Sequence, residues 1–232
     1  TIKNITCQAG DGASSYSSIL AVTAVKGYTF SDEAPLFLIN NSHLDTQWNW
    51  DITTTIDEYV KATLNDNLSR MAKYPSFRFN FEGAVKYQWM KEYYPNEYEK
   101  LKNYIAEGRW NPSGGAWDAN ETMVASSESL LRNLLYGQQF YKKEFGKKGG
   151  TAIMLPDCFG FGWTLPTVAS HCGLIGFSSQ KLGWRTNPFF PDNKKFPYTF
   201  GKWVGVDGST IMMAHGYDHN KKWELNEDLS NS

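Results

Sequence analysis

The sequence has few cysteines, no excess of charge of either sign and no long apolar run. Its three cysteines, Cys7, Cys158 and Cys172, are widely spaced, odd in number and outside any Cys-x-x-Cys pair, which argues against a disulfide framework. The 23 basic and 24 acidic residues give a net charge of -1, so we expect no nucleic-acid partner. No stretch approaches the roughly 20 apolar residues that cross a bilayer, so we expect no membrane partner either.

Aromatic residues, by contrast, are abundant. They make up 16% of the 232 residues and include nine tryptophans. Some must form the core, but an excess of tryptophan also suits carbohydrate binding, because the ring face packs on the apolar face of a pyranose. A chain of this length can bury a sizeable core, and we expect one large α/β domain rather than two small ones.

The order of apolar patterns predicts repeated strand, loop and helix units. Short apolar or alternating stretches predict strands, and apolar residues at helical spacing predict the helices between them. Strands are expected at 36–39, 77–81, 151–155 and 174–178, with one more short strand within 108–118 that breaks into a glycine-rich loop. Helices are expected at 54–73, 83–94, 96–107, 126–143 and 163–172, and a hairpin at 198–204 and 209–215. This pattern indicates an α/β fold with a parallel sheet, either an open sheet or an incomplete β/α barrel. Residues 1–35 are a lead-in segment with an early strand, and 36–232 are the main domain.

Polar residues gather where the predicted strands end. His43 and Asp45 are two residues apart, so in an extended chain both side chains point to the same side. Such a pair is half of a metal site, although a hydrogen-bonded histidine followed by a helix-capping aspartate would look the same. Asp157 and Lys181 also follow predicted strands, as do Glu82 and Asp118. In α/β folds the chemistry collects at the carboxyl ends of strands, which favours the metal site.

The residue types indicate a chemistry. His43, Asp45 and Asp157 would bind a metal through one nitrogen and two carboxylates and leave a position open, as catalytic zinc sites do, although manganese or cobalt could substitute. A bound cation keeps Asp157 ionised, which suits a nucleophile. A retaining glycosidase needs such a nucleophile together with a second carboxylic acid.

Several of these motifs, in the same order, resemble the α-mannosidases of glycoside hydrolase family 38. The resemblance covers roughly residues 36 to 215. It is carried by Ser42-His-Leu-Asp-Thr-Gln-Trp48, the loop Gly114-Gly-Ala-Trp-Asp118, the helix that begins at Ser126, Leu155-Pro-Asp-Cys-Phe-Gly160, Gln180-Lys-Leu-Gly-Trp184 and the turn Gly205-Val-Asp-Gly208.

The resemblance implies a catalytic domain with a seven-stranded β/α barrel that binds one zinc ion. His43 and Asp45 match two zinc ligands, and Asp157 matches the residue that is both zinc ligand and nucleophile. Among the substrate-binding positions, Trp48 matches the aromatic residue under the mannose ring, Phe159 lines the pocket, and Lys181 stands where a basic residue faces the substrate. The implied reaction is the hydrolysis, with retention, of terminal α-linked mannose from oligosaccharides.

One departure concerns the groups that complete the site. The family's fourth zinc ligand and its acid/base carboxylate lie downstream of this region, so we expect a truncated catalytic domain, with additional domains in the same polypeptide, that need not be active by itself. His215, Asp218 and His219 are candidates by their place in the sequence alone. Two alternatives stay open: a metal-dependent carbohydrate deacetylase, in which zinc activates a water, and a non-catalytic carbohydrate-binding fragment that uses Trp48, Trp117 and Trp163.

Overall fold

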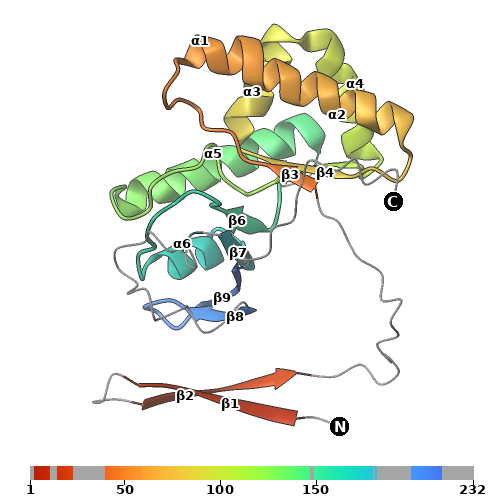
Figure 1. Ribbon diagram of the computed structural model, residues 1–232. Coiled ribbons are helices and arrows are strands. Elements are labelled where there is room, and N and C mark those ends of the chain that lie inside the picture. Colours follow the sequence, from red (N-terminus) through yellow and green to blue (C-terminus); the bar gives the residue numbers. More distant parts are fainter. Residues whose placement is uncertain are drawn as a thin grey trace. The chain divides into compact units, whose positions relative to one another are not determined.

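The computed structural model describes residues 3–10, 15–22, 40–146, 149–179, 181 and 200–215. The chain divides into two units, Thr1–Leu38 and Ile39–Ser232. In the first unit, β1 (Lys3–Gly10) and β2 (Ser15–Val22) pair as an antiparallel hairpin (Figure 1). The apolar run led us to expect one strand here, and its partner was missed because β1 is rich in polar residues.

The second unit has an α/β fold, as the alternation of patterns predicted. In chain order its elements are β3 (Asn40–Ser42), α1 (Ile52–Thr54), a π-helical turn (Thr55–Val60), α2 (Lys61–Lys73), β4 (Phe79–Glu82), α3 (Ala84–Tyr93), α4 (Pro95–Ala106), β5 (Trp110–Ser113), α5 (Ser127–Phe145), β6 (Ala152–Met154), α6 (Leu165–His171), β7 (Gly176–Ser179), β8 (Phe200–Val204) and β9 (Thr210–His215). The predicted strand at 36–39 and the proline-rich stretch before β8 lie outside the described residues. None of the helices in the described part of the chain is both long and apolar enough to span a membrane.

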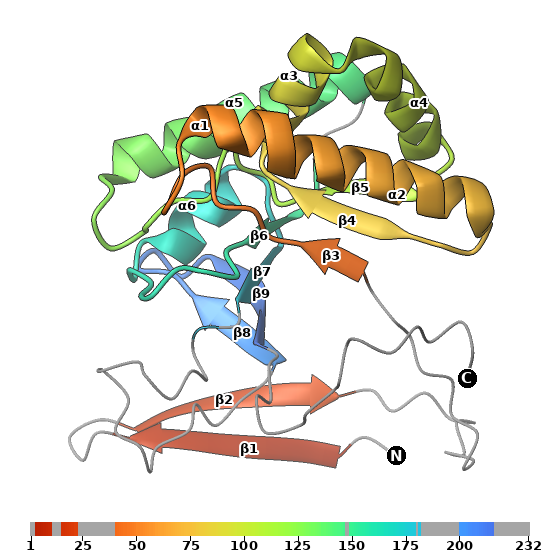
Figure 2. The same ribbon diagram turned by 45° about the horizontal axis from the view of Figure 1, so that its top comes forward.

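The strands form two sheets that meet at β5 and β6. β3, β4 and β5 are parallel in one sheet; in the other, with order β6-β7-β9-β8, only the hairpin partner β8 is antiparallel. Gly115 N donates to Ala152 O at 3.1 Å and Gly150 N donates to Pro112 O at 3.0 Å, so β6 lies beside the end of β5 (Figure 2). The described residues thus show a three-stranded and a four-stranded sheet, and not the closed seven-stranded barrel that the resemblance implies.

Side chains along these strands point alternately to the two faces of the sheet, and helices cover the face that carries the apolar side chains. Phe79 and Phe81 on β4 and Trp110 on β5 are buried beneath α2, α3 and α4, whereas Asn80 between them is half-buried on the other face. A second core cluster surrounds Phe177 of β7 and receives residues of α6. The carboxyl ends of the parallel strands therefore lie at one edge, held by two apolar clusters.

The loop after β5 also fixes the neighbouring helices. The first turn of α3 has no side-chain cap; instead, Ala84 N and Val85 N donate to Ala116 O and Trp117 O at 3.2 and 2.9 Å. On the other side, a Cβ at Gly137 of α5 would lie 2.3 Å from the carbonyl carbon of Ala116, so only glycine lets α5 pack this closely. The loop from Gly114 to Asp118 thus contacts both α3 and α5 closely.

Candidate metal centre and active site

The structure brings Asp157 together with His43 and Asp45, although Asp157 lies far from both in the sequence. His43 and Asp45 follow β3, and Asp157 follows β6. One ligand atom from each of the three side chains lies within 4.8 Å of the others. The side chains come from the two different sheets, so the cluster depends on the contact between β5 and β6. The three side chains together could hold a cation.

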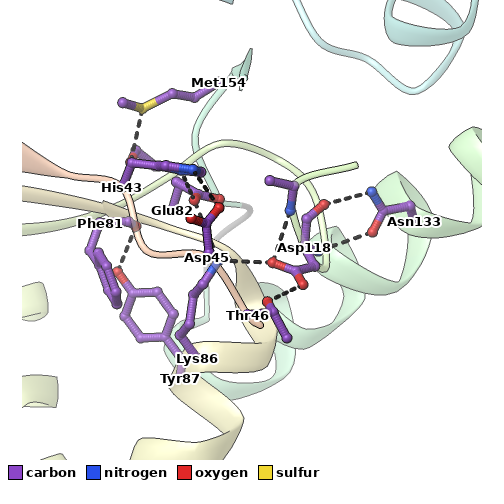
Figure 3. Close-up of polar contacts among 12 residues, drawn as sticks. His43, Asp45, Thr46, Phe81, Glu82, Lys86, Tyr87, Asp118, Asn133 and Met154 are labelled. Atoms are coloured by element: carbon purple, nitrogen blue, oxygen red, sulfur yellow. Dashed lines mark hydrogen bonds and ion pairs between the residues drawn. The ribbon is translucent and has the colours of Figure 1, made fainter. Parts of the chain in front are cut away.

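The two nitrogens of His43 have different surroundings. Nδ1 lies 3.1 Å from Glu82 Oε1 and hydrogen-bonds to it (Figure 3). Nε2 is buried without a hydrogen-bond partner, and it faces Asp45 Oδ1 at 3.3 Å. A buried, unpaired nitrogen is unusual, and here it faces the interior of the carboxylate cluster. The unpaired nitrogen fits a metal ligand better than a fully hydrogen-bonded histidine. Asp45 is not the helix cap, because the side chain of Asp51 caps α1.

Lys181 and Phe159 lie beside Asp157. The ammonium group of Lys181 forms an ion pair with the Asp157 carboxylate, and it lies 4.7 Å from the centre of the Phe159 ring. Lys181 is buried, whereas Phe159 is 46% exposed and offers ring surface to solvent. The structure therefore places Lys181 against the predicted nucleophile and the Phe159 ring against Lys181.

Trp48, the third predicted substrate-binding residue, lies on the loop that follows Asp45. Its side chain is 70% exposed and its ring meets Trp50 edge to face, with the ring centres 6.0 Å apart. Thr55, fully buried in the π-helical turn, donates to Thr46 O at 2.8 Å and accepts from Trp50 Nε1 at 2.9 Å. These contacts hold the loop while leaving the Trp48 ring open, as a sugar-stacking residue requires.

The loop that carries Asp157 is held by Glu121, which was not predicted to take part. Glu121 Oε2 accepts from Phe159 N at 3.3 Å, and Oε1 accepts from the Cys158 thiol at 3.3 Å. Thr122 adds a hydrogen bond from its hydroxyl to Gly160 O at 2.7 Å. No spacing in the sequence relates Glu121 to Asp157, since the two loops follow different strands.

A row of charged side chains, buried at Glu82 and Lys86 and partly exposed at Asp118, lies next to His43. Glu82 Oε1 lies 3.4 Å from Lys86 Nζ, which lies 2.8 Å from Asp118 Oδ1 (Figure 3). Asp118 also accepts from the Thr46 hydroxyl, and Asn133 of α5 pairs with its backbone through two hydrogen bonds of 3.0 and 2.8 Å. Glu82 and Asp118 stood out as strand-end acids, but Lys86 was missed. The four-residue spacing of Glu82 and Lys86 gave no signal, because Glu82 lies on β4 and only Lys86 lies on α3.

The neighbouring charges of His43, Glu82, Lys86 and Asp118 shift one another's pKa values. Burial alone would lower the pKa of His43, but the hydrogen bond and negative charge of Glu82 outweigh it and raise that pKa. Burial would raise the pKa of Glu82, yet the neighbouring Lys86 ammonium lowers it. For Lys86 the opposing charges of Glu82 and Asp118 outweigh burial and raise the pKa. The buried carboxylate and ammonium therefore both stay charged at neutral pH.

Three further candidate ligands cannot be compared with this cluster. The side chain of His215 and all of Asp218 and His219 lie outside the described residues. The side chain of His171 is 66% exposed, and its Nε2 lies 2.8 Å from Asp207 Oδ2. That pair connects α6 to the turn between β8 and β9.

Fold and site together define an α/β domain with a candidate metal centre at the carboxyl ends of its parallel strands. The sequence pattern of the N-terminal domain of glycosyl hydrolases family 38 matches residues 33–230, which is most of the chain. The chain belongs to this family. This assignment confirms the resemblance seen in the sequence, and it favours the glycosidase over the deacetylase and the binding fragment.

Curated relatives are similar over about three quarters of the chain. α-Mannosidase G of Dictyostelium discoideum is 37% identical over 177 residues, which are 76% of this chain and 16% of that protein. α-Mannosidase 2C1 of Homo sapiens is 32% identical over 171 residues, or 74% of this chain and 16% of that protein. The chain thus spans a small fraction of the length of the relatives that it matches.

Solved structures share the fold. An α-mannosidase from Enterococcus faecalis V583 superposes with a TM-score of 0.65 at 22% identity, over 76% of this chain and 19% of that one. A 4-α-glucanotransferase from Thermococcus litoralis superposes with a TM-score of 0.55 at 12% identity, over 78% and 27% of the two chains. At these identities the likeness concerns the fold alone.

Proposed function

We propose that this chain is the N-terminal part of the catalytic domain of a retaining, zinc-dependent α-mannosidase. Its substrate would be an oligosaccharide that ends in α-linked mannose. The observation that carries the proposal is the cluster of His43, Asp45 and Asp157, whose ligand atoms lie within 4.8 Å of one another. The family and the names of the curated relatives support the same reaction.

The residues present suit zinc. One imidazole nitrogen and two carboxylates are ligands that zinc accepts, and they leave a fourth position for another ligand and room for substrate. The unpaired Nε2 of His43 acquires a partner when a cation binds. When bound, zinc supplies a positive charge that holds sugar hydroxyl groups and polarises their surroundings.

Asp157 is the nucleophile in this proposal. Its side chain is 33% exposed and so can be reached by substrate, while the Lys181 ammonium lies against one of its oxygens. The carboxylate attacks the anomeric carbon, the bond to the leaving oxygen breaks, and a second carboxylic acid protonates that oxygen. A water molecule, deprotonated by the same second group, then displaces Asp157. Two inversions give net retention. We expect the second acid from the polypeptide downstream of β9.

The aromatic and basic side chains position the sugar. Trp48 would stack on the apolar face of the terminal mannose, and Phe159 would line the pocket beside the nucleophile, since both rings are exposed. Lys181 would donate hydrogen bonds to substrate hydroxyl groups from its place above Phe159. These roles place all three side chains around one sugar ring.

The two sheets would belong to a seven-stranded barrel. Backbone hydrogen bonds relate β5 to β6, so parallel strands follow one another in the order β3, β4, β5, β6, β7 and β9. One further strand would complete the barrel. The chain spans 16% of the relatives' length, which supports further domains in the same polypeptide.

The test is an assay of the full-length protein on an aryl α-mannoside, after metal removal and after addition of zinc. We expect activity with zinc, and a loss of about a thousandfold or more in the Asp157→Asn variant, because the nucleophile is removed. Asp66→Asn is the matched control, since Asp66 is an exposed carboxylate on α2. NMR of the first product anomer tests retention. Equal rates in the wild-type protein and Asp157→Asn would rule the proposal out.

A further inference from the structure

The charged side chains of Glu82, Lys86 and Asp118 lie next to the metal cluster but contribute no ligand to it. We infer that Glu82 is a positioning residue: it holds the His43 proton on Nδ1, so that Nε2 presents a lone pair to the metal. Lys86 and Asp118 in turn hold Glu82 in place. The inference rests on the proposed function, because it needs a metal at His43.

The geometry fixes which nitrogen carries the proton. Glu82 Oε1 lies 3.1 Å from Nδ1, and an ionised carboxylate can only accept hydrogen bonds, so Nδ1 must be the donor. In neutral imidazole the other nitrogen then has a lone pair. That lone pair faces Asp45 Oδ1 at 3.3 Å, and two acceptors at this distance repel unless a proton or a metal cation lies between them. The pair of Glu82 and His43 thus leaves a position that a metal fits.

Glu82 itself cannot turn away from His43. Its side chain is only 2% exposed and lies at the end of β4, where Lys86, fully buried on the first turns of α3, meets the same Oε1 at 3.4 Å. Lys86 is held in turn by Asp118 at 2.8 Å. A rigid carboxylate orients the histidine more strictly than a mobile one, because few rotamers are open to it.

The same three charged residues also hold the loop that carries His43 and Asp45 at two points. Asp118 accepts from the Thr46 hydroxyl, one residue beyond Asp45, and the backbone of Asp118 is fastened to Asn133 on α5. The loop is therefore held at His43 through Glu82 and at Thr46 through Asp118, with Lys86 between the two carboxylates. This arrangement fixes both ligands that β3 provides.

The first experiment reads the proton position directly in metal-free full-length protein. Histidine labelled with ¹⁵N gives nitrogen shifts that distinguish Nδ1–H from Nε2–H, and the His43 signals are assigned by their loss in His43→Asn. We expect Nδ1–H in the wild-type protein and a changed tautomer mixture in Glu82→Gln, because the glutamine amide can also donate to Nδ1. An Nε2–H tautomer in the wild-type protein overturns the inference, even if Glu82→Gln does not fold.

The second experiment measures zinc affinity by competition with a chelator. We expect Glu82→Gln to bind zinc about 10- to 100-fold more weakly, the usual cost of losing such a support, and Glu82→Asp to recover part of the loss. Glu144→Gln is the matched control: Glu144 pairs with Lys91 Nζ at 2.7 Å, outside the metal cluster. Its zinc affinity should be unchanged.

The outcomes separate this inference from the proposed function. If the wild-type protein binds no zinc, the metal centre fails and the inference fails with it. If the wild-type protein binds zinc and Glu82→Gln binds it equally well with the same His43 tautomer, only the inference fails. A lower melting temperature in Glu82→Gln without these two changes would mean that Glu82 is merely structural, and this too overturns the inference.

Discussion

His43 is a residue whose two ring nitrogens do different work. Nδ1 is fixed by Glu82, the last residue of the neighbouring strand β4, and Nε2 faces the carboxylates of the cluster. A cation at Nε2 competes with a proton for the same lone pair, so metal binding weakens as the pH falls. The local chemistry of this one side chain therefore depends on residues contributed by β4 and β6.

At the residue scale, Gly83 tests how tightly the buried lysine is held. Gly83 has φ +89°, and an added Cβ would lie 2.8 Å from Lys86 Nζ and 3.0 Å from Lys86 Cδ. The end of a lysine chain can usually move aside, but Lys86 is pinned between Glu82 and Asp118. We expect Gly83→Ala to lower the free energy of unfolding by about 2–4 kcal/mol, from backbone strain and overpacking together.

Gly108→Ala is the control for the backbone contribution. Gly108 has φ +72° and nothing within 4 Å of its added Cβ, so only the cost of the left-handed conformation, about 1–2 kcal/mol, should remain. Thermal unfolding of both variants in the full-length protein gives the difference. Equal losses in the two variants would show that Lys86 moves freely.

At the scale of elements, side chains connect the loops after β5 and β6 by accepting hydrogen bonds from backbone N–H groups of neighbouring segments. Glu121 accepts from Phe159 N in the loop after β6, and Asn133 of α5 accepts from Asp118 N. Backbone N–H groups in irregular segments need partners, and these side chains provide them. The loops after β5 and β6 are thus joined to each other through Glu121, and the loop after β5 is joined to α5 through Asn133.

Asp207 fastens α6 to the turn between β8 and β9. Its carboxylate accepts from Ser209 Oγ at 2.6 Å, Thr167 Oγ1 at 2.8 Å and His171 Nε2 at 2.8 Å. Hydrogen bonds from Ser209 first, then from His171 and Thr167, hold the pKa of Asp207 well below its usual range. A carboxyl whose pKa is lower folded than unfolded adds stability above the unfolded pKa of about 3.9, and this is lost as the pH falls further.

We therefore expect Asp207→Asn to loosen this contact at neutral pH and to remove its dependence on acid. Hydrogen exchange of peptides covering 165–171 and 200–215, corrected for intrinsic rates, should show lower protection in the variant at pH 7. Between about pH 4 and pH 2 the wild-type protection should fall toward that of the variant. Asp66→Asn, at an exposed ion pair, should change neither region. Unchanged protection in Asp207→Asn would contradict the expectation.

At the scale of the whole molecule, the proposed metal would join the two sheets. Two ligands follow β3 in the three-stranded sheet, and Asp157 follows β6 in the four-stranded sheet. A metal that binds only the folded arrangement stabilises it by mass action, by about 2.7 kcal/mol when its concentration is 100 times Kd.

Removal of the metal should therefore lower the melting temperature of the full-length protein, and zinc should restore it. Asp45→Asn should melt at the same temperature with and without zinc, because one ligand is lost. The measurement is thermal unfolding with chelator, with zinc and with magnesium as the control ion. An equal response to zinc in the wild-type protein and Asp45→Asn would place the stabilising metal elsewhere.

Within the second unit, the sequence by itself determined the order of strands and helices and the polar residues near the strand ends. Apolar periodicity placed the helix over 54–73 and the strand at 77–81 close to where α1 through α2 and β4 lie, because these patterns depend only on neighbours in the chain. The spacing of His43 and Asp45 sufficed to expect both on one side.

Only the tertiary structure decided which strand ends meet. Contacts between segments far apart in sequence place Glu82 against His43 and bury Lys86 between two carboxylates. Such contacts also place β6 beside β5. Periodicity reports the environment of a residue, but not the identity of its partner across a sheet. The candidate site could be recognised residue by residue, whereas its geometry and the buried support behind it required the fold.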